Sequence, residues 1–101
     1  MNAVMKKYAG PVLRQGEIAD AVIEAIREDN PGKEILIVEH TSYLRVRVEQ
    51  ECLINRETVE RMLGRPFQMR ELEVNMPGFA GFIRTSTESV RFVLNSAPAA
   101  A

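Results

Sequence analysis

The chain has 101 residues, 13 of them basic and 14 acidic, for a formal net charge of −1. This length indicates a single domain that folds alone but leaves little core for a deep substrate cavity. The near-neutral charge, without a block of Lys and Arg, gives no support for nucleic-acid binding. No apolar run is long enough to span a membrane, and the start has no signal-peptide core. With Cys52 as the single cysteine, a cytoplasmic location is expected.

The first predicted element is an amphipathic helix over residues 17–28. Ile18, Val22 and Ile26 recur every four residues and define its apolar face. The helix is expected to end at the "DNPG" turn, residues 29–32, because proline cannot continue a helix.

Two strands are predicted next, over residues 33–40 and 43–50. In the second strand apolar residues alternate with charged ones, the apolar set being Leu44, Val46 and Val48. This alternation is typical of a half-buried strand with one face in water. Residues 51–54 are expected to continue this strand or to follow it through a bend.

A second, shorter helix is predicted over residues 56–64. Asn55 is a favourable N-cap, and Gly64 suits the left-handed conformation that often ends a helix. The expected buried face consists of Val59, Met62 and Leu63. Two ion pairs at i, i+4 spacing are also expected, Arg56 with Glu60 and Glu57 with Arg61.

The last third of the chain is predicted to consist of strands, at residues 71–76, 80–84 and 89–95. The tail, residues 96–101, is expected to be disordered, like an N-terminal arm over residues 1–9. The order of helix, strands, helix and strands predicts one compact α+β domain with mainly antiparallel pairing.

No residue pattern predicts catalysis. His40 is expected to be an exposed turn residue, and Cys52 a buried structural thiol. The sequence contains no histidine pair, Cys-x-x-Cys motif or Gly-rich phosphate loop. We therefore expect no metal site, no cofactor site and no catalytic residue. An enzyme using His40 or Cys52 is the least favoured hypothesis.

The segment "VNMPGFAGFIR", residues 74–84, is instead typical of a contact surface. In a regular strand Phe79 and Ile83 share one face, which favours them as core residues. Phe82 then faces outward, unless a bulge at Gly81 reverses the alternation or the sheet is covered on both faces. Both positions of Phe82 stay open from the sequence.

Three segments in order carry a resemblance to a known family: residues 10–35, "GPVLRQGEIADAVIEAIREDNPGKEI"; residues 53–83, "LINRETVERMLGRPFQMRELEVNMPGFAGFI"; and residues 90–95, "VRFVLN". Together they resemble the effector proteins, also called coupling or regulatory proteins, of bacterial multicomponent diiron monooxygenases. The toluene monooxygenase branch is the most similar.

This resemblance implies an effector domain over residues 10–95 with two small β-sheets and two principal helices. It implies a non-catalytic protein without cofactor or metal, which binds a diiron hydroxylase. Binding would tune oxygen activation, substrate access and the coupling of NADH oxidation to hydroxylation. The system would also contain a reductase, with or without a ferredoxin. The free protein is expected to be monomeric.

The resemblance also suggests which residues face the hydroxylase. One candidate set follows the second helix: Asn75, Met76, Pro77, Gly78, Phe79, Ala80, Gly81 and Phe82. The other lies on that helix: Asn55, Arg56, Glu57 and Arg61. The arm before Pro11 is a further candidate. The alternative function is a small-ligand-binding regulatory domain, because compact α+β modules often bind metabolites between helix and sheet.

Overall fold

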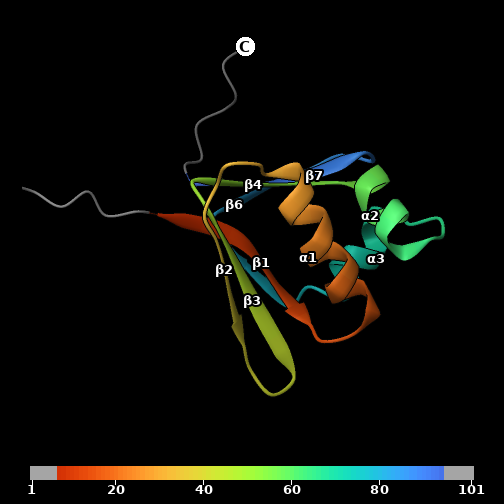
Figure 1. Cartoon of the computed structure of the whole chain (residues 1–101), viewed down its shortest axis with the longest axis horizontal. Helices are drawn as coiled ribbons and strands as arrows, with labels where there is room; N and C mark the ends of the chain where they lie inside the picture. The colour runs from red at the N-terminus through yellow and green to blue at the C-terminus, as the bar shows by residue number, and fades with distance from the viewer. Residues whose placement is uncertain (1–6, 95–101) are drawn as a thin grey trace, which may run out of the picture.

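A computed structural model describes residues 7–94 of the chain. Its elements are β1 (Tyr8–Arg14), α1 (Glu17–Asp29), β2 (Ile35–Glu39), β3 (Tyr43–Glu49), β4 (Glu51–Asn55), α2 (Arg56–Leu63), α3 (Met69–Val74), β5 (Gly78–Ala80), β6 (Phe82–Thr85) and β7 (Ser89–Val93) (Figure 1). The strands form two antiparallel sheets. Sheet A has the order β2-β3-β1-β5, and sheet B the order β4-β7-β6. The expected α+β fold with two small antiparallel sheets is confirmed.

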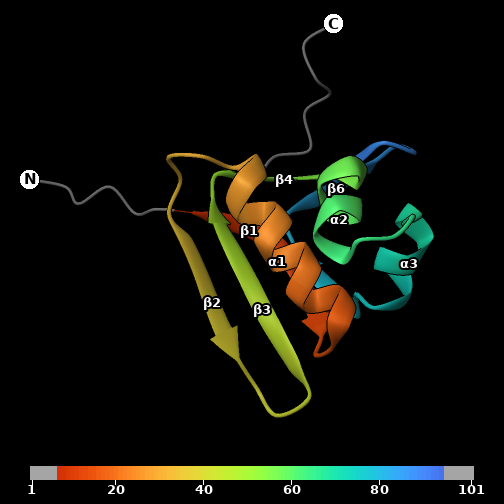
Figure 2. The same cartoon turned by 45° about the vertical axis from the view of Figure 1, so that its right-hand side comes forward.

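One core joins the two sheets and the first helix. The apolar face of α1 packs with the inward residues of β1 and β3, and sheet B adds Ile54 and Phe92. Figures 1 and 2 show α1 lying between β3 and α2, with the helices gathered on one side of sheet A. The predicted alternation in β3 is confirmed, because Leu44, Val46 and Val48 are all buried.

The chain changes sheets at two residues with positive φ. Gln50, at φ 68°, lies between β3 and β4, where a bend was expected. Gly81, at φ 98°, connects β5 of sheet A to β6 of sheet B. A Cβ atom at Gly81 would lie 2.6 Å from the carbonyl oxygen of Val93, so only glycine fits this second crossover.

Strand β1 was not expected from the sequence, because Gly10 and Pro11 lie inside it. A Cβ atom at Gly10 would approach the carbonyl oxygen of Val46 to 2.3 Å, so the two backbones are in close contact here. The strand begins at Tyr8 and therefore includes the last two residues of the expected arm. Residues 1–6 and 95–101, which hold the rest of the arm and the expected tail, lie outside the described residues.

The strand predicted at residues 71–76 is wrong, because this region forms α3. The Glu71 carboxylate accepts a hydrogen bond from the backbone N–H of Gln68 at 3.0 Å, as in a capping box. Met69 and Leu72, three residues apart, are both buried. The helical spacing of these two side chains outweighs the alternating pattern that favoured a strand.

The second helix begins after Asn55 and ends before Gly64, which is left-handed at φ 73°, as predicted. The Asn55 side chain forms no cap. Instead, Asp29 of α1 accepts the Asn55 backbone N–H at 2.9 Å and the Thr58 hydroxyl at 2.8 Å. Val59 is buried as expected, whereas Met62 is exposed.

Candidate functional site

The segment from Asn75 to Phe82 contains β5, an edge strand of sheet A, and enters sheet B at Phe82. Among residues 7–94, strand β5 pairs only with β1, where Gly78 lies opposite Val12 and Ala80 opposite Gly10. These two small residues lie on the face of sheet A that points away from α1. Their lack of side-chain bulk lets another backbone approach closely.

Phe79 lies on the opposite face of β5, because its cross-strand partner is the buried Pro11. Its ring packs against Phe92, with centroids 5.6 Å apart, yet 42% of the residue stays exposed. The expectation that Phe79 is a core residue is therefore wrong. Its side chain faces the interior, but β5 is an edge strand, so Phe79 has a neighbouring strand on one side only.

Phe82 faces outward, which decides between the two positions that the sequence left open. Its partner is Val93, while the neighbouring Ile83 pairs with the buried Phe92. Phe82 thus lies on the outer face of sheet B and is 49% exposed. A large exposed aromatic of this kind is a candidate anchor for a protein contact.

The loop between α3 and β5 is held to the sheet by its own polar groups. The Asn75 carbonyl accepts the backbone N–H of Arg14 at 2.8 Å, and its side-chain amide donates to the Glu71 carbonyl at 2.8 Å. Met76 packs partly against the core, and Pro77 is exposed. These contacts hold the loop that leads into β5, the edge strand of sheet A.

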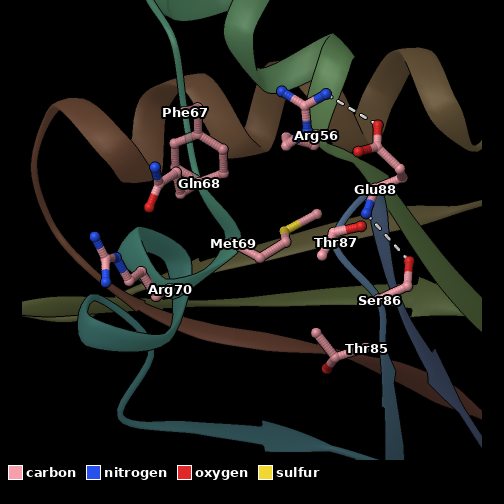
Figure 3. A pocket seen from close by; sticks show the side chains of 9 residues that line it. All are labelled: Arg56, Phe67, Gln68, Met69, Arg70, Thr85, Ser86, Thr87 and Glu88. Atoms are coloured by element: carbon pink, nitrogen blue, oxygen red, sulfur yellow. Dashed lines mark hydrogen bonds and ion pairs between the residues drawn. The ribbon is translucent and has the colours of Figure 1, made fainter.

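The charged candidates on α2 bond within the chain. Arg56 forms the expected pair with Glu60 at 2.7 Å. It forms a second pair with Glu88 at 2.9 Å, which Figure 3 shows. The expected pair of Glu57 with Arg61 is wrong, because Arg61 bonds instead to Glu28 of α1.

These bonds also shift the pKa values of the two arginines. The hydrogen bond with Glu88 raises the pKa of Arg56, and the one with Glu28 raises the pKa of Arg61. Both arginines hold elements of the chain together.

A surface pocket of about 640 Å³ opens beside α2 (Figure 3). Its lining comes from α2, the α2–α3 loop, α3, the end of β6 and the β6–β7 turn. It consists of Arg56, Phe67, Gln68, Met69, Arg70, Thr85, Ser86, Thr87 and Glu88. Its size suits a small molecule. Because Arg56 and Glu88 bond to each other, they do not form a free acid–base pair.

The two residues considered for chemistry lie as expected. His40 is exposed and its ring stacks on Tyr43, with centroids 4.4 Å apart. Cys52 is fully buried, and desolvation raises the pKa of its thiol to about 12. Within residues 7–94, no group of three acidic, His or Cys side chains could hold a metal ion. No helix there is long and apolar enough to cross a membrane.

Three further residues beside Gly78 and Ala80 were not singled out from the sequence. Arg14, Arg45 and Arg47 lie on the outer face of sheet A, because their neighbours Leu13, Leu44 and Val46 point into the core. The alternation in residues 43–49 was the available signal. This pattern predicted that one face of the strand is exposed to solvent, but it did not indicate a binding surface there.

Known proteins are similar to this chain in sequence and in fold. Residues 7–93 match the model of the MmoB/DmpM family. The alkene monooxygenase system effector subunit of Xanthobacter autotrophicus strain Py2 is 39% identical over 91 residues, 90% of each chain. The phenol 2-monooxygenase stimulatory component DmpM of Pseudomonas sp. strain CF600 is 36% identical over 73 residues, 72% of this chain and 77% of that one.

Solved structures agree with this match. A chain in a structure of the phenol hydroxylase–regulatory protein complex superposes with a TM-score of 0.72 at 26% identity, covering 90% of this chain and 100% of that one. A chain from a second structure of that complex gives a TM-score of 0.66, also at 26% identity, covering 88% of this chain and 99% of the other.

Proposed function

The chain belongs to the MmoB/DmpM family, and on this premise we propose that it is the non-catalytic effector subunit of a multicomponent diiron monooxygenase. The observation that carries the proposal is the match over nearly the whole described chain to relatives named as effector and stimulatory components. The similar solved chains come from complexes of a hydroxylase with its regulatory protein, which supports a hydroxylase as the partner here.

In this role the chain acts by binding. An effector changes the activity of its partner only if it binds one conformation of that partner more tightly than the other. A non-catalytic role is consistent with the two residues considered for chemistry. The thiol of Cys52 is buried and protonated, and the ring of His40 is exposed. Tighter binding to the oxygen-activating conformation would direct electrons from NADH into product rather than peroxide.

The segment Asn75–Phe82 is the proposed contact surface. Gly78 and Ala80 allow close backbone approach at the edge of sheet A. Phe82 presents an exposed ring on sheet B, beyond the crossover at Gly81. The residues of α2 are weaker candidates, because Arg56 and Arg61 already form ion pairs within the chain.

The finer proposal concerns the substrate. The sequence resemblance favours an aromatic hydrocarbon and a toluene-type hydroxylase, whereas two relatives belong to alkene and phenol systems. We propose the toluene type as the first partner to test and the other two as alternatives. The complete system would include a reductase, with or without a ferredoxin, to deliver electrons to the hydroxylase.

The test is a titration of this protein into toluene-type, phenol-type and alkene-type diiron hydroxylases, each with its own electron-transfer components. NADH consumed, hydroxylated product and hydrogen peroxide are followed together. We expect product per NADH to rise with one hydroxylase and to saturate near one effector per active site. If no hydroxylase changes its rate or its coupling, the proposed function is wrong.

A second candidate function is binding of a small ligand in the pocket beside α2. The pocket volume of about 640 Å³ is the observation that favours it. A ligand that binds the native state raises the melting temperature as its concentration rises. A panel of metabolites that shifts the melting temperature, while no hydroxylase does, would support the sensor over the effector.

A further inference from the structure

The outer face of sheet A presents small and aliphatic residues beside its charged side chains. Cross-strand pairs place Leu36 beside Arg47, Val38 beside Arg45, Val12 between Arg45 and Gly78, and Gly10 beside Ala80. Leu36 and Val38 are 39% and 44% exposed, whereas the residues that alternate with them turn toward the core. No described element covers this face, and the helices gather on the other side of the sheet (Figures 1 and 2).

Three arginines of this surface have no acidic partner among the described residues. Within residues 7–94, Arg14, Arg45 and Arg47 form no ion pair. Five arginines elsewhere pair with glutamates, namely Arg27, Arg56, Arg61, Arg65 and Arg91, whereas Arg70 on α3 pairs with no described glutamate. The part of the outer face that holds Arg14 and Arg45 therefore carries positive charge that no described acidic side chain neutralises, on a chain whose net charge is −1.

Arg45 adds a more specific signal, because its Nε atom is buried and has no hydrogen-bond acceptor. A buried donor without an acceptor lowers stability, so such atoms are rare in folded proteins. The side chain lies between Val38 and Val12, in the centre of the face. A carboxylate arriving from outside could accept from the Nε–H and a terminal N–H together, the geometry in which guanidinium groups bind carboxylates best.

The glutamates of this face lie at its other end. Glu49 accepts the backbone N–H of Glu34 at 3.3 Å, and the Tyr8 hydroxyl donates to Glu34. The Leu36–Arg47 pair lies between them and the Val38–Arg45 pair, so the acidic side chains lie at one end of the face and Arg45 and Arg14 lie toward the other. This asymmetry would orient an incoming protein surface.

We propose that the outer face of sheet A docks on an acidic surface of the hydroxylase, and that a partner carboxylate binds Arg45. This inference rests on the proposed function and specifies the chemistry of its contact. Gly78 and Ala80 belong to the same face, so the docked surface is continuous with the segment proposed above. The exposed arginines would steer the approach of the hydroxylase, while the small and aliphatic residues of the face allow close packing.

The test compares three single variants. Arg47→Glu reverses an exposed charge on the face. Arg45→Lys keeps the charge but removes the Nε–H and the planar fork. Arg70→Glu is the matched control, because Arg70 is exposed on α3, forms no ion pair within residues 7–94, and lies beside the pocket rather than on sheet A. Denaturation curves first establish that each variant is folded.

Affinity is then measured at several salt concentrations for the hydroxylase that the wild-type chain couples best. Arg47→Glu should weaken binding about tenfold or more and flatten its salt dependence. Arg45→Lys should weaken binding about tenfold while changing the salt dependence little. Arg70→Glu should stay within about twofold of wild type. An Arg45→Lys variant that fails to fold leaves Arg47→Glu to decide.

Several outcomes would overturn the inference. If Arg47→Glu binds like Arg70→Glu while wild type still couples, the docking face is elsewhere and the effector function survives. If wild type binds no hydroxylase, both proposals fail. A fluorescent single-stranded oligonucleotide that binds more tightly than the hydroxylase, with loss on Arg47→Glu, would assign the face to nucleic acid. A wild-type dimer that Arg47→Glu dissociates would assign it to a second copy.

Discussion

Helix α2 and the outer face of sheet A both carry arginines, and the two regions use them differently. On α2, Arg56 bonds to Glu60 and Glu88, and Arg61 bonds to Glu28 of α1. On sheet A, Arg45 and Arg47 reach no acidic side chain within residues 7–94. Residue type alone does not identify a contact surface. Whether the charge is already neutralised inside the chain is the more informative property.

The two phenylalanines of the β5–β6 segment repeat this contrast. Phe79 packs its ring on Phe92, whereas Phe82 presents its ring outward from sheet B. One aromatic therefore supports the fold, and the other is available to a partner. The following predictions test whether side chains with internal partners act on stability and those without act on binding.

The largest expected effect on stability is that of Phe79→Ser. Losing a partly buried ring and its contact with Phe92 should lower the free energy of unfolding by about 1 to 3 kcal/mol, less than for a fully buried aromatic. Phe82→Ser should change it by less than about 1 kcal/mol but weaken hydroxylase binding. Chemical denaturation and a binding titration measure the two quantities. Equal stability losses would show that Phe82 belongs to the core.

A smaller loss is expected for Glu60→Ala. Its carboxylate accepts from Arg56 at 2.7 Å and from the backbone N–H of the buried Phe67 at 2.9 Å. Leaving that N–H without an acceptor should cost about 1 to 2 kcal/mol. Glu57→Ala, one turn earlier on the same helix, is the control and should cost less than about 0.5 kcal/mol. A fall in hydroxylase affinity with unchanged stability would place α2 in the contact after all.

Acidification should weaken the interactions that the carboxylates of Glu28 and Glu71 make in the folded protein. The hydrogen bond from the Gln68 backbone, and then Arg65, lowers the pKa of Glu71, while Arg61 lowers that of Glu28. A lowered folded-state pKa stabilises the protein above the unfolded value of 4.5, and this contribution is lost as the pH falls through the folded pKa. Denaturation midpoints between about pH 6 and about pH 3 should therefore fall less in a Glu28→Gln, Glu71→Gln double variant. An unchanged pH dependence would mean that neither carboxylate contributes.

The smallest expected effect is that of Arg61→Gln on hydroxylase binding. Because Arg61 is already paired with Glu28, its removal should leave the affinity within about twofold of wild type. The measurement is a binding titration beside Arg47→Glu. A loss as large as that of Arg47→Glu would contradict the distinction between paired and unpaired arginines.

Much of the fold could be predicted from local patterns. The apolar face of α1, the alternation in β3 and the left-handed Gly64 each depend on residues that are neighbours in sequence. Strand β1 was missed because Gly10 and Pro11 argue against a strand, and the close approach to Val46 that accommodates Gly10 is a tertiary contact. The α3 helix was missed because its cap at Gln68 was not recognised.

The candidate site was harder to predict for a related reason. The outward position of Phe82 was one of two open possibilities, since it depends on the crossover at Gly81. The partner of Arg61 depends on how α1 packs against α2, which no local spacing encodes. The outer face of sheet A joins residues from four strands that are far apart in the sequence. Sequence alternation could find its wet side chains but could not bring them together.

Arginine footprinting of the complex tests the central claim most directly. An arginine-specific dicarbonyl reagent is applied to the free protein and to the hydroxylase complex, and modified residues are identified by mass spectrometry. We expect Arg14 and Arg47 to lose reactivity in the complex, while Arg70 on α3 keeps it. Protection of Arg70, with Arg14 and Arg47 still reactive, would contradict docking through the outer face of sheet A.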